Sequence, residues 1–105
     1  MPNEPNRLET RTPLRVAVDL ATLEIRYPAL QGVTENVSLH GARVVTAAPL
    51  PLNERLNIRS LVGSLRSRAR VVYCEPRPGG EFVVGLQLSA TAGDWTMPQF
   101  RTRAS

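Results

Sequence analysis

The sequence predicts an all-β fold, a small barrel of six short antiparallel strands. Apolar residues alternate with polar or small ones along most of the chain, which is typical of strands that bury one face. Prolines and glycines separate these stretches, and no long helical pattern interrupts them. Closure into a barrel is favoured because it leaves no sheet edge exposed.

The chain begins with a polar segment that differs from the rest. Residues 1–14 contain three prolines and show no apolar periodicity, so we expect a flexible N-terminal arm, followed by a barrel domain over residues 15–105. Two strands are expected next, where apolar residues alternate with others at Val16, Val18 and Leu20 and again at Leu23, Ile25 and Tyr27.

The middle of the chain predicts two further strands. Residues 33–48, interrupted at Gly41, favour a third strand with a bulge or a corner. Residues 56–58 mark a fourth strand. The dipeptide Gly63-Ser64 after it is typical of a type II′ hairpin turn, which would lead directly into the next strand.

The last two strands have the clearest alternation. In the first of them, Arg66, Arg68 and Arg70 share one face, while apolar or small residues share the other. We interpret this arginine stripe as the solvated face of a strand, with contact to an acidic partner as the alternative. A reversal at residues 76–80 precedes the final strand, which is marked by Phe82, Val84, Leu86 and Leu88. The tail, residues 91–105, is a candidate for a short C-terminal helix that presents Trp95 and Phe100 to the barrel.

Length and composition exclude several classes of protein. A chain of 105 residues has room for one domain and none for a separate catalytic domain. No stretch approaches the about 18 apolar residues of a membrane helix, and the N-terminus lacks the apolar centre of a signal peptide, so we expect a soluble cytoplasmic protein. With one cysteine, Cys74, and one histidine, His40, the chain lacks the groups for a disulfide, a metal site or a hydrolase. We therefore expect neither catalysis nor a cofactor.

The charged residues point to an anionic partner. All thirteen basic residues are arginine, and the formal net charge is +4. A GC-rich genome would also produce this composition. The functional alternative is that guanidinium groups grip phosphates or guanine edges in a bidentate fork.

Two short motifs carry candidate binding residues. Arg11 and Arg15 lie four residues apart where the arm meets the first strand, and Arg7 repeats this spacing one step earlier. Further along, Asn36 and Ser38 are followed by Gly41. In an extended strand the amide and the hydroxyl point to the same side and can offer several hydrogen bonds to one ligand, while glycine allows a close approach.

In this order and spacing, the motifs resemble those of the PilZ family, an RxxxR sequence followed by D/N-x-S-x-x-G. The resemblance implies a PilZ-type β-barrel that binds the bacterial second messenger cyclic di-GMP through Arg11, Arg15, Asn36, Ser38 and Gly41. The family often has another arginine directly before the first of the pair, where this chain has Thr10. Whether one or two nucleotides bind is therefore open, and Arg7 is a hypothetical substitute.

The resemblance also implies a mechanism and leaves alternatives. A ligand that contacts both the arm and the barrel would close the arm and change the surface offered to a separate protein partner, in processes such as motility or biofilm formation. A PilZ-like adaptor that acts through protein contacts without nucleotide is one alternative. The other is a basic barrel that binds single-stranded nucleic acid, which five aromatic residues make less favourable because such proteins stack bases on exposed rings.

Overall fold

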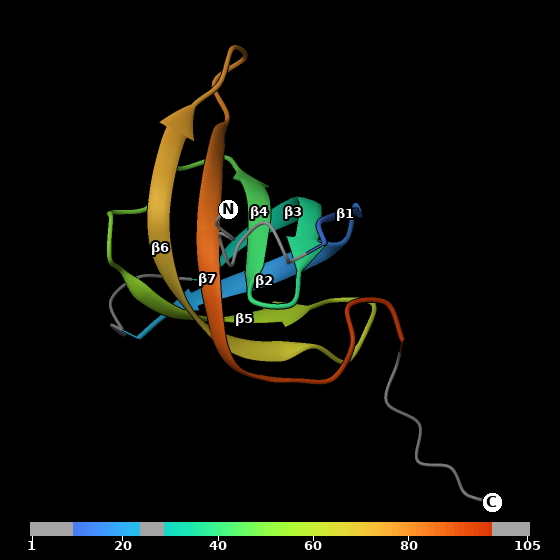
Figure 1. Cartoon of the computed structure of the whole chain (residues 1–105). Helices are drawn as coiled ribbons and strands as arrows, with labels where there is room; N and C mark the ends of the chain where they lie inside the picture. Colours follow the sequence, from blue (N-terminus) through green and yellow to red (C-terminus); the bar gives the residue numbers. More distant parts are fainter. Residues whose placement is uncertain (1–9, 24–28, 98–105) are drawn as a thin grey trace, which may run out of the picture.

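Six antiparallel strands close into a barrel, and a seventh short strand pairs beside them (Figure 1). The computed structural model of the chain describes residues 10–23 and 29–97. The strands are β1 (Thr12–Pro13), β2 (Ala17–Thr22), β3 (Leu30–Ser38), β4 (Gly41–Thr46), β5 (Arg55–Ser60), β6 (Arg66–Pro76) and β7 (Phe82–Ala92). Around the barrel the order is β3-β2-β5-β6-β7-β4, and β4 pairs with β3 to close it. The predicted fold class, an all-β six-stranded barrel, is confirmed.

The alternating apolar residues fill the inside of the barrel. Leu20, Leu56, Ile58 and Val71 are almost completely buried and come from three different strands. Along β5 and the first half of β6, every second residue is buried and every other one is exposed, as the sequence predicted. Each fully buried aliphatic side chain of this kind contributes roughly 1.5–3 kcal/mol to folding, so the interior holds the strands in register.

The stretch from residue 33 to 48 is two strands rather than one. β3 and β4 form a hairpin in which Ser38 pairs with Gly41 and only Leu39 and His40 make the turn. The expectation of a single strand with a bulge or a corner is therefore wrong, because the chain reverses at Leu39 and His40. Reversal lets both segments bury alternate residues in the same core. Of the strand expected at residues 23–27, Leu23 is exposed, and residues 24–28 lie outside the described part of the chain.

The connection between β5 and β6 also differs from the prediction. Residues 61–65 make the connection, and Gly63 does not have the positive φ that a type II′ turn requires at its first position. Gly63 serves a tertiary contact instead. The C-terminal segment passes so close that a Cβ on Gly63 would lie 2.2 Å from the carbonyl oxygen of Trp95.

The described part of the C-terminal tail contains no helix. Residues 93–97 form bends, and Trp95 packs partly buried against the core without helical structure. The expected helix is wrong for these residues, because a left-handed Gly93 turns the chain as it leaves β7. Phe100 lies outside the described residues. Within the described ranges there is no helix with the length and apolar character needed to span a membrane.

Candidate functional site

A β-bulge at Glu35 places three polar residues of β3, Glu35, Asn36 and Ser38, on the outside of the barrel. The register of β3 against β4 shifts between Thr34 and Asn36, so Glu35 is the extra residue. Thr34 and Val37 are buried, whereas Glu35, Asn36 and Ser38 are half-buried. A regular strand would turn Glu35 and Asn36 to opposite faces, and the bulge removes that constraint.

Strand β1 brings the arginine motif to the same place. Pro13 pairs with Asn36 and Thr12 with Val37, so the end of the predicted arm is part of the sheet. Arg11 Nη1 donates a hydrogen bond of 2.7 Å to Asn36 Oδ1. The first arginine of one motif therefore contacts the amide of the other, 25 residues away in sequence. Arg7 lies outside the described residues.

Thr34 fixes the backbone on both sides of Arg15. Its Oγ1 donates to the carbonyl oxygen of Leu14 at 2.5 Å and accepts from the N–H of Val16 at 2.8 Å. The backbone N–H of Thr34 donates to the carbonyl of Val16 at 3.0 Å. Thr34 is fully buried and Arg15 is exposed, so the threonine holds the chain while the guanidinium faces outward. Thr34 is not among the predicted site residues, although the sequence shows a hydroxyl at an inward-facing strand position.

Arg15 borders a hollow next to the bulge. The hollow has a volume of about 320 Å³ and is lined by Arg15, Glu35, Arg77 and Glu81 together with other residues of β3 and β4. Arg15 therefore lies beside Glu35, while Arg11 contacts Asn36. The two arginines of the motif thus border neighbouring parts of β3, on the same outer face.

Glu35 binds two further arginines that belong to neither motif. Arg77 donates to both carboxylate oxygens, from Nη1 at 2.5 Å and from Nη2 at 3.0 Å, and Arg43 Nε donates at 3.1 Å. The hydrogen bonds from Arg77 hold the pKa of Glu35 below its usual value of 4.5; partial burial opposes this, and Arg43 adds to it. The carboxylate therefore stays charged and keeps both guanidinium groups beside the site.

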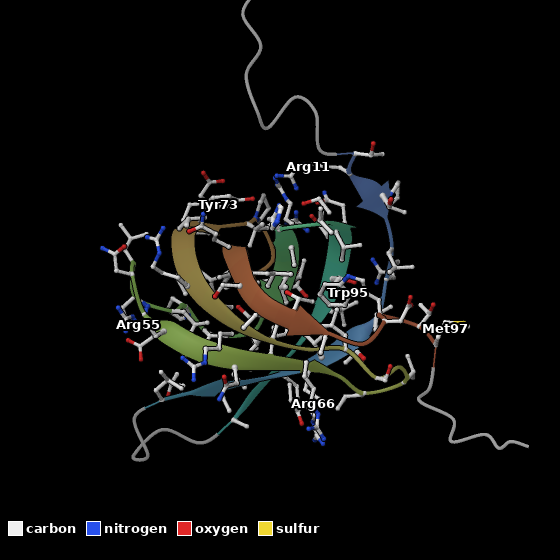
Figure 2. All side chains as sticks on the ribbon, turned by 60° about the horizontal axis from the view of Figure 1, so that its bottom comes forward. Arg11, Arg55, Arg66, Tyr73, Trp95 and Met97 are labelled. Carbon is white, nitrogen blue, oxygen red and sulfur yellow. The ribbon has the colours of Figure 1, made fainter. Side chains whose placement is uncertain are left out.

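Arg43 is held from its other side by Tyr73. Its Nη1 donates to the tyrosine hydroxyl at 3.4 Å, and its guanidinium carbon lies 6.0 Å from the centre of the ring. Tyr73 in turn lies across Gly85, where an added Cβ would come within 2.1 Å of the ring. Figure 2 shows Tyr73 and Arg11 toward the same end of the barrel. Only a glycine at position 85 lets the ring lie flat enough to support Arg43 in this way.

The glycine of the second motif has a steric role. A Cβ on Gly41 would lie 3.3 Å from both the carbonyl oxygen of Leu86 and Ser38 Oγ, which is tighter than most contacts of this kind. Its φ is not in the left-handed region, so the requirement is for space and not for an unusual backbone conformation. His40 is exposed at the hairpin turn, and the described residues contain no cluster of three or more side chains able to hold a metal ion.

Comparison with known proteins identifies the family. The family model of the PilZ domain matches residues 5–95, which includes both motifs and all seven strands. The chain belongs to the PilZ family. PilZ domains form a family of cyclic di-GMP receptors and are generally binding or adaptor domains rather than enzymes.

A solved structure shares the fold of this PilZ domain. The Bacillus subtilis inhibitor of motility, MotI/DgrA, superposes with a TM-score of 0.66 at 20% sequence identity. The match covers 88% of this chain and 49% of MotI/DgrA, so the chain corresponds to about half of that protein. No curated protein matches the sequence.

Proposed function

We propose that this PilZ domain binds cyclic di-GMP on the outer face of β3 and β4, where the end of the arm pairs with the barrel. The hydrogen bond between Arg11 and Asn36 is the observation that carries the proposal. It joins the two motifs whose residues resemble the ligand-binding residues of the family. Two groups that are far apart in sequence thereby offer a guanidinium and an amide to one ligand.

The residue types fit the chemistry of the ligand. Cyclic di-GMP presents two phosphates and two guanines, and a planar guanidinium can pair with phosphate oxygens or with O6 and N7 of guanine. Arg11 and Arg15 take these roles. Asn36 and Ser38 donate or accept hydrogen bonds from the barrel surface, and Gly41 leaves the space that Ser38 Oγ and the Leu86 carbonyl oxygen occupy.

The expected affinity follows from these contacts. A hydrogen bond to a charged group contributes roughly 1.5–3 kcal/mol, so four such contacts outweigh the loss of the exposed Arg11–Asn36 bond and of side-chain entropy at Arg11 and Arg15. The result is a micromolar or tighter receptor. Arg43 and Arg77 add positive charge at the same surface, only partly neutralised by Glu35.

The site also suggests how nucleotide binding affects contact with a protein partner. Part of it comes from the segment before β2 and part from the rigid hairpin of β3 and β4, so a ligand that contacts both favours the closed arrangement. Closure changes the surface around β1. A separate protein partner then binds the nucleotide-bound form and the nucleotide-free form with different affinities.

Isothermal titration calorimetry with cyclic di-GMP tests the proposal, with cyclic di-AMP and GTP as control ligands. We expect saturable binding of cyclic di-GMP alone and at least tenfold weaker binding after Arg15→Ala, about 1.4 kcal/mol. Arg68→Ala is the matched control, because Arg68 is exposed on β6 and should leave affinity unchanged. A folded protein that gives no heat with cyclic di-GMP would contradict the proposal and favour an adaptor that acts by protein contacts alone.

A further inference from the structure

The outer face of β5 and β6 carries a dense group of arginines that the nucleotide site does not use. We call it the arginine face: Arg55, Arg59, Arg66, Arg68 and Arg70, all of them exposed. The register places Arg55 directly opposite Arg70 and Arg59 directly opposite Arg66, with Asn57 opposite Arg68. Like charges directly opposite each other on neighbouring strands destabilise a sheet, so this arrangement is not explained by folding.

Little of this charge is neutralised within the described part of the chain. The ion pair between Arg59 Nη2 and Asp19 Oδ2, at 2.9 Å, is the single contact there between the arginine face and a carboxylate. Arg70 is held instead by two neutral amide oxygens, Asn53 Oδ1 at 2.9 Å and Gln87 Oε1 at 2.6 Å. These bonds fix the guanidinium in place and leave its charge uncompensated.

The arginine face lies on the other side of the barrel from the candidate nucleotide site. Around the barrel, β5 and β6 are separated from β3 and β4 by β2 on one side and by β7 on the other. Figure 2 shows Arg66 and Arg11 at opposite ends of the molecule. A function of this face therefore does not depend on nucleotide binding at β3.

We propose that the arginine face is a docking surface for an extended acidic segment of a partner protein. Arg66, Arg68 and Arg70 occupy alternate positions of one strand, so they repeat about every 6.7 Å. Carboxylates at alternate positions of an extended segment have the same spacing. Guanidinium and carboxylate groups pair through two parallel hydrogen bonds, which gives such a match both energy and direction.

The surface has the other features of a protein interface. A hollow of about 470 Å³ lies between Arg55, Arg68, Arg70 and Gln87, with room for carboxylate side chains. Beside the Arg59–Arg66 pair, Leu61 and Val62 are 41% and 61% exposed and supply apolar contact area. Since β5 and β6 are paired on both edges, an added segment can be recognised only by side chains and not by extending the sheet.

Other anionic partners fit less well. No exposed position of β5 or β6 is aromatic, whereas proteins that bind single-stranded nucleic acid stack bases on exposed aromatic rings. A fluid lipid surface requires no regular spacing of charge. Arg59 and Arg70 are held in fixed orientations by Asp19, Asn53 and Gln87, and such preorganisation favours a partner with carboxylates at defined positions.

Fluorescence anisotropy with a labelled twelve-residue peptide of alternating glutamate and threonine tests the proposal. We expect saturable binding that weakens with salt, and no binding of the peptide with glutamine in place of glutamate. The double substitution Arg66→Glu and Arg68→Glu should weaken binding at least tenfold. Asn57→Ala, at the neutral position between the arginines, is the matched control and should change binding less than twofold.

Four further arms make the outcome decisive. Arg15→Ala should keep peptide binding, which separates this proposal from nucleotide binding. Arg66→Gln and Arg68→Gln together remove the charge without reversing it, and should weaken binding even if the glutamate variant fails to fold. The proposal would be overturned if the glutamate-threonine peptide fails to bind, or if the protein with Arg66→Gln and Arg68→Gln binds it as tightly as the wild-type protein does. Tighter binding of a mixed oligonucleotide or of phosphatidylglycerol vesicles than of the peptide would also overturn it.

Discussion

Replacing Glu35 by glutamine tests the ionic cluster that supports the site. The wild-type carboxylate accepts hydrogen bonds from Arg77 at 2.5 and 3.0 Å and from Arg43 at 3.1 Å. The exposed fractions of the side chains are 25% for Glu35, 32% for Arg77 and 37% for Arg43. The cluster is therefore intermediate between a surface ion pair, which contributes about 0.2–1 kcal/mol, and a well-shielded charged hydrogen bond, which contributes about 1.5–3 kcal/mol. We expect Glu35→Gln to lower the free energy of unfolding by about 1–2 kcal/mol at pH 7. This corresponds to a fall in Tm of roughly 4–16 °C for a domain of this size.

The dependence on pH identifies charge as the cause. Because the pKa of Glu35 is lowered in the folded protein, its contribution is complete above the ordinary pKa near 4.5 and is lost as pH falls through the folded-state value. Thermal unfolding of both proteins should therefore differ from neutral pH down to about pH 5 and converge in stronger acid. Glu75→Gln, an exposed position on β6, is the control. An equal difference at pH 7 and pH 2.5, or none at pH 7, would refute the reasoning.

Two further substitutions test how the barrel positions the site. Thr34→Val leaves the buried N–H of Val16 and the carbonyl of Leu14 without the threonine hydroxyl. We expect the free energy of unfolding, measured with denaturant, to fall by about 1–3 kcal/mol and to be partly restored in Thr34→Ser. Equal stability of all three proteins would contradict this role of the hydroxyl. Gly85→Ala forces a Cβ against the ring of Tyr73 and should lower the free energy of unfolding by about 1–3 kcal/mol. The same substitution in a Tyr73→Ala background should lower it much less. An equal loss in both backgrounds would show that the ring is not the obstacle.

Much of the fold follows from the sequence because a barrel strand has one buried face. Along β5 and the first half of β6 the structure places the alternating residues inside and outside as the period of two predicts, whereas in β7 the four consecutive residues Val83–Leu86 are all buried. The hairpin at Leu39 and His40 was missed because neither residue is a common turn former. The interruption at Gly41 marks the right place, but the chain reverses there instead of forming a bulge or a corner.

The candidate site was predictable only as separate motifs. The spacing of Asn36 and Ser38 predicts that they share the outer face of the strand. In the structure both are half-buried and Val37 between them is buried, which agrees with this prediction. The bulge at Glu35 could not be read from sequence, since it depends on how β3 pairs with β4. For the same reason Arg77 was missed, because it reaches Glu35 from a turn 42 residues further along.

The most direct measurement is a titration of ¹⁵N-labelled protein with cyclic di-GMP, followed by two-dimensional NMR. If one nucleotide site joins the two motifs, backbone amides of Arg11, Arg15, Asn36, Ser38 and Gly41 should shift together along one saturation curve, while Asn57 and Arg68 on the opposite side stay unchanged. Shifts restricted to β5 and β6, or an unchanged spectrum at saturating nucleotide, would contradict a cyclic di-GMP site on β3 and β4.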